Sequence, residues 1–442
     1  MPAVPPFRLC YLRSAMNISK KKDSWYQNRG YRHFDRPMTF ASAIALVENP
    51  DRVQGHAFLP FVSYETEQKR YVKDKNQTIK KLRRVAYASH SDSHIFSYYG
   101  KQLSRLYEER LVDEGLERTV LAYRRLSEPK SNIDFAERAF SLIRGRCSCI
   151  AVGLDLESFF DTLPHHLLKS QWASLLGVKR LPPDHFAVYK ALTRWSYVDR
   201  SSIMKEFDIS KKDLRSPTPF CSPQNFRERL RDKGEVKPGY IFNRGYRGIP
   251  QGSPMSGLAS NIAFLPIDKI VHECAVKLDV SYLRYSDDVL LIGSPDEVSR
   301  VQALLTSTVE LYGMKINPDK TVQSNFWRNS TGNLSSDKPL QYLGFLFDGQ
   351  RVLVRSQTVA RSIRKMKRGV RAAKLQARRS GRLYKYSLYG RYSHLGWKGK
   401  GKRGRSNFWT YAMRAHRKME QSQIKRQLRR HWTRLNQEIK DT

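Results

Sequence analysis

The sequence predicts an α+β protein, and three stretches carry that prediction. Residues 280–292 hold two apolar, β-prone runs around a short polar break, which is typical of a β-hairpin. Residues 150–154 form a short apolar run that indicates a buried strand. After residue 357, apolar side chains recur at helical spacing, which predicts a C-terminal helical region with one apolar stripe and a basic face.

The predicted hairpin carries two adjacent carboxylates at its tip, in the run Tyr285-Ser286-Asp287-Asp288. Aspartate is a common turn residue, so an isolated pair of this kind is most often structural. Two like charges side by side raise each other's pKa unless a multivalent cation lies between them. An apolar hairpin with such a pair therefore indicates a metal site, provided that a third carboxylate lies nearby.

Asp155 is the candidate for the third carboxylate. It stands at the carboxyl end of the strand predicted at residues 150–154, where a side chain faces an open crevice. Glu157 and Asp161 are also acidic and are the alternatives. We expect Asp155 to join the two hairpin aspartates around Mg²⁺, with Mn²⁺ as the alternative, because these hard cations prefer carboxylate oxygens.

A glycine-rich loop that leads into a helix lies between these acidic segments, from Arg247 to Ile270. Its glycines let the backbone approach a ligand closely, and Ser253 followed by Pro254 favours the start of a helix. The helix has an apolar stripe, so most of it belongs to the core. Gln251 lies on the loop and has no evident structural partner, which makes it a candidate ligand contact.

Three segments, LDLESFFDTLPH, GIPQGSPMSGLASN and YSDD, strongly resemble motifs A, B and C of reverse transcriptases, in the order of that family. INPDKT at residues 316–321 is similar to the next motif, and YLGFLF at residues 342–347 is similar to the primer-grip hairpin. The resemblance implies a right-hand polymerase. Its fingers and palm would combine an antiparallel sheet with helices, and a helical thumb would follow at the C-terminus.

Two segments upstream, at residues 89–111 and 120–140, resemble the fingers of the bacterial reverse transcriptases of antiphage defence. That group is known as the "unknown group" and is related to the abortive-infection and retron enzymes. The resemblance implies an RNA-directed DNA polymerase that copies a dedicated noncoding RNA in antiviral defence. Its partners would be that RNA, dNTPs, an RNA/DNA or DNA product, and either a second reverse transcriptase subunit or a second copy of the chain.

The resemblance also assigns roles to residues. Asp155 and Asp287 would each bind two Mg²⁺ ions, and Asp288 would be a supporting ligand. With these ions in place, the 3'-hydroxyl of a primer would attack the α-phosphate of a dNTP. Phe160 would exclude a 2'-hydroxyl, although a core position suits this residue equally well on composition. The other candidates are the nucleotide-binding residues Gln251, Arg124, Arg125 and Lys320, and the primer-grip residues Tyr342, Leu343 and Gly344.

The net charge points to a polyanionic partner. The chain has 80 Lys and Arg against 41 Asp and Glu, a formal charge of +39. The excess is greatest at residues 357–442, where aromatic side chains interleave with the basic ones, as in proteins that stack on bases and bind phosphates. A disordered basic arm is the alternative, and KGKGKRGR at 398–405 is predicted to be a mobile loop.

Three regions are expected: an N-terminal extension or fingers segment at 1–85, the fingers and palm at 86–356, and the basic thumb at 357–442. Residues 200–245 are predicted to be a polar insertion. The five cysteines form no CxxC pair, which argues against structural zinc and a disulfide scaffold and favours a reducing cytoplasm. No apolar run approaches the length of about 18 residues that a membrane span needs.

Two alternative functions stay open. Some relatives of the abortive-infection type make DNA without a template or from a protein primer, and the residues do not exclude either activity. A catalytically vestigial RNA-binding scaffold is the other alternative. The three aspartates together with Gln251 and Phe160 favour an active enzyme.

Overall fold

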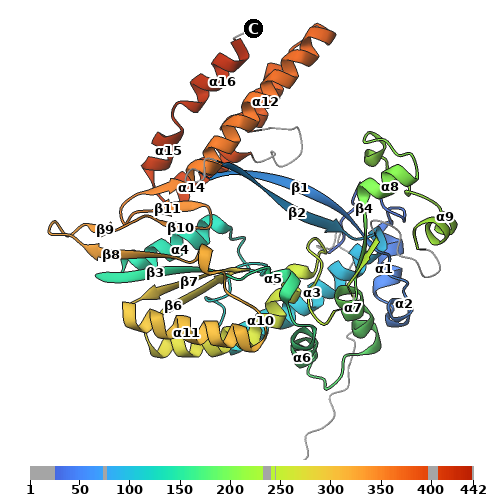
Figure 1. Cartoon of the computed structure of the whole chain (residues 1–442), viewed down its shortest axis with the longest axis horizontal. Helices are drawn as coiled ribbons and strands as arrows, with labels where there is room; N and C mark the ends of the chain where they lie inside the picture. Colours follow the sequence, from blue (N-terminus) through green and yellow to red (C-terminus); the bar gives the residue numbers. More distant parts are fainter. Residues whose placement is uncertain (1–24, 73–76, 232–239, 244, 397–406, 441–442) are drawn as a thin grey trace, which may run out of the picture.

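A computed structural model of the chain describes residues 25–72, 77–231, 240–243, 245–396 and 407–440 (Figure 1). A five-stranded sheet lies between two layers, with helices α10 and α11 on one side and helix α4 with a smaller sheet on the other (Figure 1). The mixed α+β class predicted from the sequence is confirmed. The loop predicted at 398–405 lies outside the described residues.

The central sheet has the strand order β6-β7-β3-β8-β9, and all neighbouring strands are antiparallel. β6 and β7 are the predicted hairpin, and β3 is the predicted buried strand. In the register of β3 with β7, Ile150 lies opposite Gly293 and Asp155 opposite Asp288. The strands are β3 (Ser148–Asp155), β6 (Ser281–Tyr285), β7 (Asp288–Gly293), β8 (Val322–Arg328) and β9 (Leu334–Ser336).

Strands β3 and β7 of this sheet are buried on both faces, which explains why they are apolar almost throughout. Side chains alternate between the faces of a strand. Val152 and Leu154 accordingly pack with helices α10 (Ser256–Lys277) and α11 (Pro295–Leu311). Ala151 faces the opposite core, with helix α4 (Asn132–Arg144) and the smaller sheet.

The N-terminal part forms a second sheet of order β2-β1-β4-β5, in which β1 and β2 make a long antiparallel hairpin and β1 runs parallel to β4. In Figure 1 this hairpin passes above the central sheet toward the C-terminal helices. The elements are α1 (Phe40–Val47), α2 (Pro50–Gln54), β1 (Phe61–Val72), β2 (Gln77–Tyr87), α3 (His90–Asp113), α5 (Phe159–Thr162), α6 (His165–Leu175), α7 (Pro183–Thr193), β4 (Ser196–Asp199) and β5 (Tyr240–Phe242).

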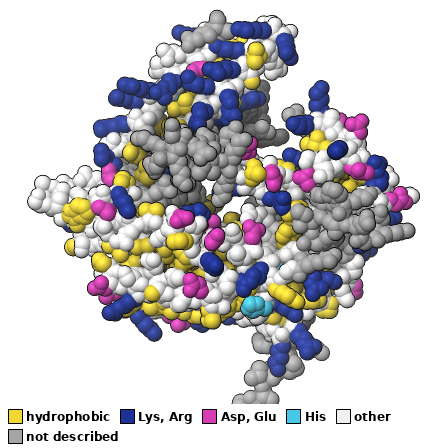
Figure 2. Space-filling view, viewed as in Figure 1, with side chains coloured by type: hydrophobic (Ala, Val, Ile, Leu, Met, Phe, Trp, Pro, Cys, Tyr) yellow, Lys and Arg dark blue, Asp and Glu magenta, His cyan; other side chains and the backbone are white. Residues whose placement is uncertain are grey.

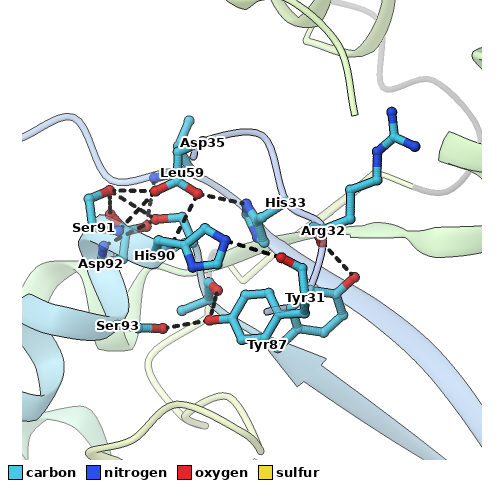
Figure 3. Close-up of polar contacts among 12 residues, drawn as sticks. Tyr31, Arg32, His33, Asp35, Leu59, Tyr87, His90, Ser91, Asp92 and Ser93 are labelled. Atoms are coloured by element: carbon cyan, nitrogen blue, oxygen red, sulfur yellow. Dashed lines mark hydrogen bonds and ion pairs between the residues drawn. The ribbon is translucent and has the colours of Figure 1, made fainter. Parts of the chain in front are cut away.

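A polar network holds the start of helix α3, as Figure 3 shows. The Asp35 carboxylate accepts hydrogen bonds from the backbone N–H groups of His90 (3.0 Å) and Ser91 (2.8 Å). The buried Asp92 carboxylate accepts one from the backbone N–H of Leu59 (3.0 Å). Carboxylates at a helix N-terminus satisfy its unpaired N–H groups. The run SHSDSH at residues 89–94 therefore connects the start of this helix to the N-terminal segment that contains Asp35 through hydrogen bonds.

Residues 200–245 are predicted to be a polar insertion, and the described part of that segment up to residue 231 contributes to a small apolar core. Phe220 and Phe226 pack with Phe34 and Val62 in a small core of their own, with the rings of Phe34 and Phe226 4.7 Å apart. These apolar residues are widely spaced in a polar segment, so no helical or strand periodicity marks them. The elements here are α8 (Arg200–Glu206), η1 (Asp213–Arg215), α9 (Pro223–Asn225) and η2 (Phe226–Leu230).

The C-terminal region is helical, as predicted, and follows a three-stranded antiparallel sheet of order β10-β11-β12. Helices α12 and α16 share a small core that contains Met366, Val370 and Leu435. Within the described ranges, no helix has the length and apolar character needed to cross a bilayer. The elements are η3 (Pro318–Lys320), β10 (Leu340–Tyr342), β11 (Phe345–Phe347), β12 (Val352–Val354), α12 (Ser356–Ser380), α13 (Lys385–Tyr392), α14 (Phe408–Lys418), α15 (Ser422–Leu428) and α16 (His431–Lys440).

Candidate active site

The hairpin β6–β7 turns through only two residues, Ser286 and Asp287, between the paired Tyr285 and Asp288. Ser286 has φ of 62°, in the left-handed region that two-residue hairpin turns require. The tight turn places Asp287 at the very tip and Asp288 at the first position of the next strand.

Strand pairing brings the third carboxylate to this tip. Asp155 ends β3 directly opposite Asp288, and the backbone N–H of Leu156 donates to the carbonyl oxygen of Asp287 at 2.9 Å. Side chains of directly opposed residues have Cβ atoms about 5 Å apart. The structure therefore brings Asp155, Asp287 and Asp288 together at one end of the sheet.

The three carboxylates repel one another. Burial raises the pKa of Asp288 to about 6, and the negative charges of Asp287 and Asp155 add to that shift, while Lys320 and Arg355 oppose it. Neither Glu157 nor Asp161 is among the charges that chiefly shift this pKa. The electrostatics thus support Asp155 over its two acidic neighbours as the third carboxylate of the site.

This donor set fits a hard divalent cation. Within the described residues, no three His, Cys, Asp or Glu side chains are placed so that they could hold a metal ion as they stand. Burial raises the pKa of Asp288 most, and the repulsion from Asp287 and Asp155 that adds to this shift is what a cation between the carboxylates would relieve. Asp155, Asp287 and Asp288 are the residues that would hold a divalent cation, which would supply charge stabilisation to a phosphoryl transfer.

Lys320 reaches this site from η3. The backbone N–H of Asn317 donates to the carbonyl oxygen of Asp155 at 2.8 Å, which anchors the INPDKT segment to the end of β3. The Lys320 ammonium then lies 2.5 Å from a carboxylate oxygen of Asp155. The segment thus supplies one positive charge to a cluster of three negative ones.

Phe160 and the glycine-rich loop lie side by side. The backbone N–H of Ile249 donates to the carbonyl oxygen of Phe160 at 2.8 Å. Gly248 has φ of 88°, and a Cβ there would lie 2.8 Å from the carbonyl oxygen of Asp161, so this position needs glycine. Phe160 is half-buried beside Phe159, with ring centroids 5.7 Å apart.

Gln251 is exposed on the loop, and its backbone contacts the N-terminal sheet. Its carbonyl oxygen accepts a hydrogen bond from the backbone N–H of Ala86 at 3.1 Å. At the next residue, Gly252, a Cβ would lie 1.7 Å from the Ala86 carbonyl oxygen, so only glycine lets the loop pass strand β2. The Gln251 side chain stands at the surface between the palm and this strand.

Arg124 and Arg125 have different surroundings. The Arg124 guanidinium is 5% exposed and pairs with the carboxylate of Glu108, with Nη2 at 2.6 Å from Oε2. It also donates to the carbonyl oxygen of Val120 at 3.0 Å. A triphosphate would have to compete with these partners for Arg124. Arg125 is exposed beside it, and its backbone N–H donates to Glu108 at 2.8 Å.

The predicted primer-grip residues form the turn between β10 and β11. Leu343 and Gly344 have φ of 44° and 94°, and the carbonyl oxygen of Leu343 accepts a hydrogen bond from the Asn132 amide at 2.9 Å. Tyr342 is buried, and its pKa is raised by burial and then by the charge of Asp288. Tyr342, next to this turn, therefore lies close to Asp288.

Arg284, which precedes the YSDD motif, was not predicted as a site residue. Its guanidinium is fully buried and pairs with Asp268 of α10, with Nε to Oδ1 at 2.7 Å and Nη2 to Oδ2 at 2.5 Å. It also donates to Asn261 (3.1 Å) and to the backbone carbonyl of Ser286 (3.2 Å). A charged residue inside an apolar strand was the sequence signal for this network.

The fold and site together define the class of this protein. An antiparallel sheet bears three carboxylates at one end, with an N-terminal α+β part before it and a helical part after it. This is the right-hand polymerase fold. Residues 215–347 match the family model described as reverse transcriptase (RNA-dependent DNA polymerase). The chain thus carries a reverse transcriptase domain. The matched stretch includes the hairpin, Gln251 and Lys320, while Asp155 and Phe160 lie upstream of it.

Solved structures of telomerase are similar to the chain. One is apo telomerase from Candida tropicalis truncated from its C-terminal domain, with 14% identity and a TM-score of 0.42 over 65% of this chain and 53% of that one. Another is telomerase from Candida albicans in complex with a fragment of telomeric RNA, with 13% identity and a TM-score of 0.37 over 73% and 52%. The chain thus spans about half the length of these structures. No curated protein sequence matches it.

Proposed function

We propose that the chain is an RNA-directed DNA polymerase that adds dNTPs to a 3'-hydroxyl by two-metal nucleotidyl transfer. The observation that carries this proposal is the convergence of Asp155, Asp287 and Asp288 at the end of the sheet. Phe160 and the loop with Gln251 lie next to each other, and the reverse transcriptase match covers this loop and the β6–β7 hairpin.

Each candidate residue has a part in the proposed reaction. Asp155 and Asp287 bind both cations, and Asp288 supports them. Lys320, already paired with Asp155, neutralises the pyrophosphate and donates a proton to it. Phe160 rejects a 2'-hydroxyl. In the same proposal, Arg125 and Gln251 contact the nucleotide, Arg124 orders the segment through Glu108, and Tyr342, Leu343 and Gly344 guide the primer end.

The proposed template is a dedicated noncoding RNA, and the proposed setting is bacterial antiviral defence. Both rest on the resemblance of residues 89–111 and 120–140 to the fingers of defence-associated enzymes. A second reverse transcriptase subunit, or a second copy of this chain, belongs to the same part of the proposal.

Incorporation of labelled dNTPs by the purified chain tests the activity. We expect incorporation that needs Mg²⁺ and stops when copurified RNA is removed with ribonuclease and then returns when that RNA is added back. Sequencing the RNA and the DNA product should show complementary strands. DNA synthesis that continues after the RNA has been removed with ribonuclease would favour template-independent synthesis. A product bound to the chain through protease-sensitive linkage would favour protein priming, and RNA binding without any product would favour the scaffold.

The C-terminal helices are proposed to grip the template–primer duplex. Figure 2 shows Lys and Arg side chains gathered over this part of the molecule. A cleft of about 250 Å³ opens between α12, α14 and the α15–α16 junction, with Val359, Ile363 and Trp409 on its apolar wall. Its basic lining consists of Arg426, Arg429, Arg430 and Arg434. Guanidinium groups around an apolar wall suit the phosphates and sugars of a nucleic acid.

We expect the affinity for a primer–template duplex to fall about ten-thousandfold between 50 and 200 mM salt, as for roughly eight phosphate contacts. Replacing both Arg429 and Arg430 with alanine should lower the slope of log K against log salt by about 2, since each phosphate contact contributes about 0.9. Fluorescence anisotropy of a labelled duplex measures the affinity and its dependence on salt. Arg300→Ala on α11 is the control and should leave the slope unchanged. An equal slope in the double variant would refute this role of the cleft.

A further inference from the structure

Tyr123 occupies a point where the three polymerase motifs meet, although no motif includes it. Its ring lies 6.4 Å from that of Phe160 in an edge-on arrangement, with the ring planes at 76°. Its hydroxyl lies 3.5 Å from the Ser286 hydroxyl at the catalytic turn. A Cβ at Gly257, at the start of α10, would lie 2.6 Å from the Tyr123 ring. The ring therefore rests directly on glycine backbone.

The backbone at Tyr123 is held in a rare conformation. Its φ is 57°, in the left-handed region that residues other than glycine seldom adopt. The flanking residues are fixed from two sides: Leu121 N–H donates to the carbonyl oxygen of Arg284 at 2.9 Å, and the Asn261 amide donates to the carbonyl oxygen of Ala122 at 2.8 Å. Such conformations persist where the surroundings impose them, and they cluster at functional sites.

Half of the Tyr123 side chain is nevertheless exposed. Phe159, the neighbour of Phe160, is by contrast buried at 2% exposure against the ring of Phe264. An aromatic ring that is anchored at its backbone, supported on glycine and open to solvent beside the carboxylates offers a flat surface to a ligand.

We propose that Tyr123 is a sugar-discriminating residue of the nucleotide site, where it forms with Phe160 an aromatic corner for the sugar of an incoming 2'-deoxynucleoside triphosphate. This inference rests on the proposed function and extends it. Phe160 is only half-buried, so a 2'-hydroxyl could push its ring aside if nothing stood behind it. The Tyr123 ring blocks that movement. Through Phe160, Tyr123 contributes to the discrimination between deoxynucleotides and ribonucleotides. Through its own exposed face, it contributes to the affinity for the nucleotide.

Steady-state kcat and KM for a dNTP and for the matching ribonucleotide test the proposal. Tyr123→Ala should lower the ratio of kcat/KM for the dNTP to that for the ribonucleotide about tenfold, the effect of losing one aromatic contact, and should raise KM for the dNTP. Tyr123→Phe keeps the ring and should hold the ratio within about twofold. Tyr246→Ala, at an 88% exposed tyrosine, is the control and should match the unmodified chain.

A purely structural role for Tyr123 gives a different result. Partial unfolding lowers kcat for both nucleotides equally and leaves the ratio unchanged, and an unchanged ratio in Tyr123→Ala would overturn the proposal. If the unmodified chain incorporates no nucleotide, the proposed function fails. The role of Tyr123 can then still be tested by measuring the binding of a dNTP. The dNTP with Mg²⁺ should then raise the melting temperature of the unmodified chain but not that of Tyr123→Ala. Equal shifts in the two proteins, or none in either, would refute the inference.

Discussion

Asparagine in place of Asp287 or Asp155 is expected to reduce kcat for nucleotide incorporation on the order of a thousandfold or more, the scale of losing an essential catalytic group. Each variant removes a charge from the three-carboxylate cluster, so the cluster holds divalent cations less tightly. Incorporation of labelled dNTPs at saturating Mg²⁺ measures the loss. Raising Mg²⁺ or supplying Mn²⁺ should recover only a small part of it.

Glu157→Gln and Asp161→Asn are the matched controls, since each removes a neighbouring carboxylate outside the cluster. Both should keep activity within a few-fold of the unmodified chain. Loss of activity in one of them, with Asp155→Asn still active, would show that the wrong carboxylate has been assigned.

Folding can be separated from catalysis in the same variants. At pH 7 the cluster is repulsive, because burial raises the pKa of Asp288 and the charges of Asp287 and Asp155 raise it further. A carboxyl group whose folded pKa is raised favours the folded state below its unfolded pKa and loses that contribution as the pH rises through about 6. Removing one charge should lower the pKa of Asp288. Asp287→Asn should therefore unfold at the same urea concentration as the unmodified chain or a higher one at pH 7.

Replacing Arg284 with methionine is expected to lower the free energy of unfolding by about 3 to 5 kcal/mol, because Asp268 is then left as a buried charge without its partner. Both side chains are fully buried, and the guanidinium also donates to the Ser286 carbonyl of the β6–β7 turn. Activity should fall as well, since the turn that carries Asp287 loses this support. Urea unfolding followed by fluorescence and incorporation assays measure the two effects.

The double variant Arg284→Met with Asp268→Leu separates the two roles of Arg284. Replacing a buried ion pair with apolar residues often restores stability. We expect most of the lost stability to return but not the activity, because nothing then holds the Ser286 carbonyl. The control is the exposed pair Arg146–Asp279, at 2.9 Å, where Arg146→Ala should cost less than about 1 kcal/mol. Recovery of both stability and activity would show that the pair serves only the fold.

The sequence predicted the local elements of the site well. Strand β3 and hairpin β6–β7 lie where apolar runs around Asp155 and Asp287 placed them. Such short-range signals are reliable because strand pattern and turn chemistry depend on neighbouring residues. The small core of residues 200–245 had no such signal, since its apolar side chains find their partners in other segments, such as Phe34.

Arg124 shows why single residues are harder to predict than elements. Its position beside Arg125 in a basic run favoured phosphate binding, and the pattern gave no reason to distinguish the two. The fold brings Glu108 of α3 against Arg124 and leaves Arg125 at the surface. Whether a cation is paired within the fold depends on which anion the tertiary structure places beside it.

The sequence by itself determined the α+β class, the carboxylate-bearing hairpin and strand, and the basic helical C-terminal region, because periodicity and turn residues act over a few neighbouring positions. Tertiary structure alone decided that Asp155 faces Asp288, that Arg284 is buried against Asp268, and that Tyr123 lies between Phe160 and Ser286. These contacts join distant parts of the chain. Their geometry follows from strand register and helix packing, which no local pattern encodes.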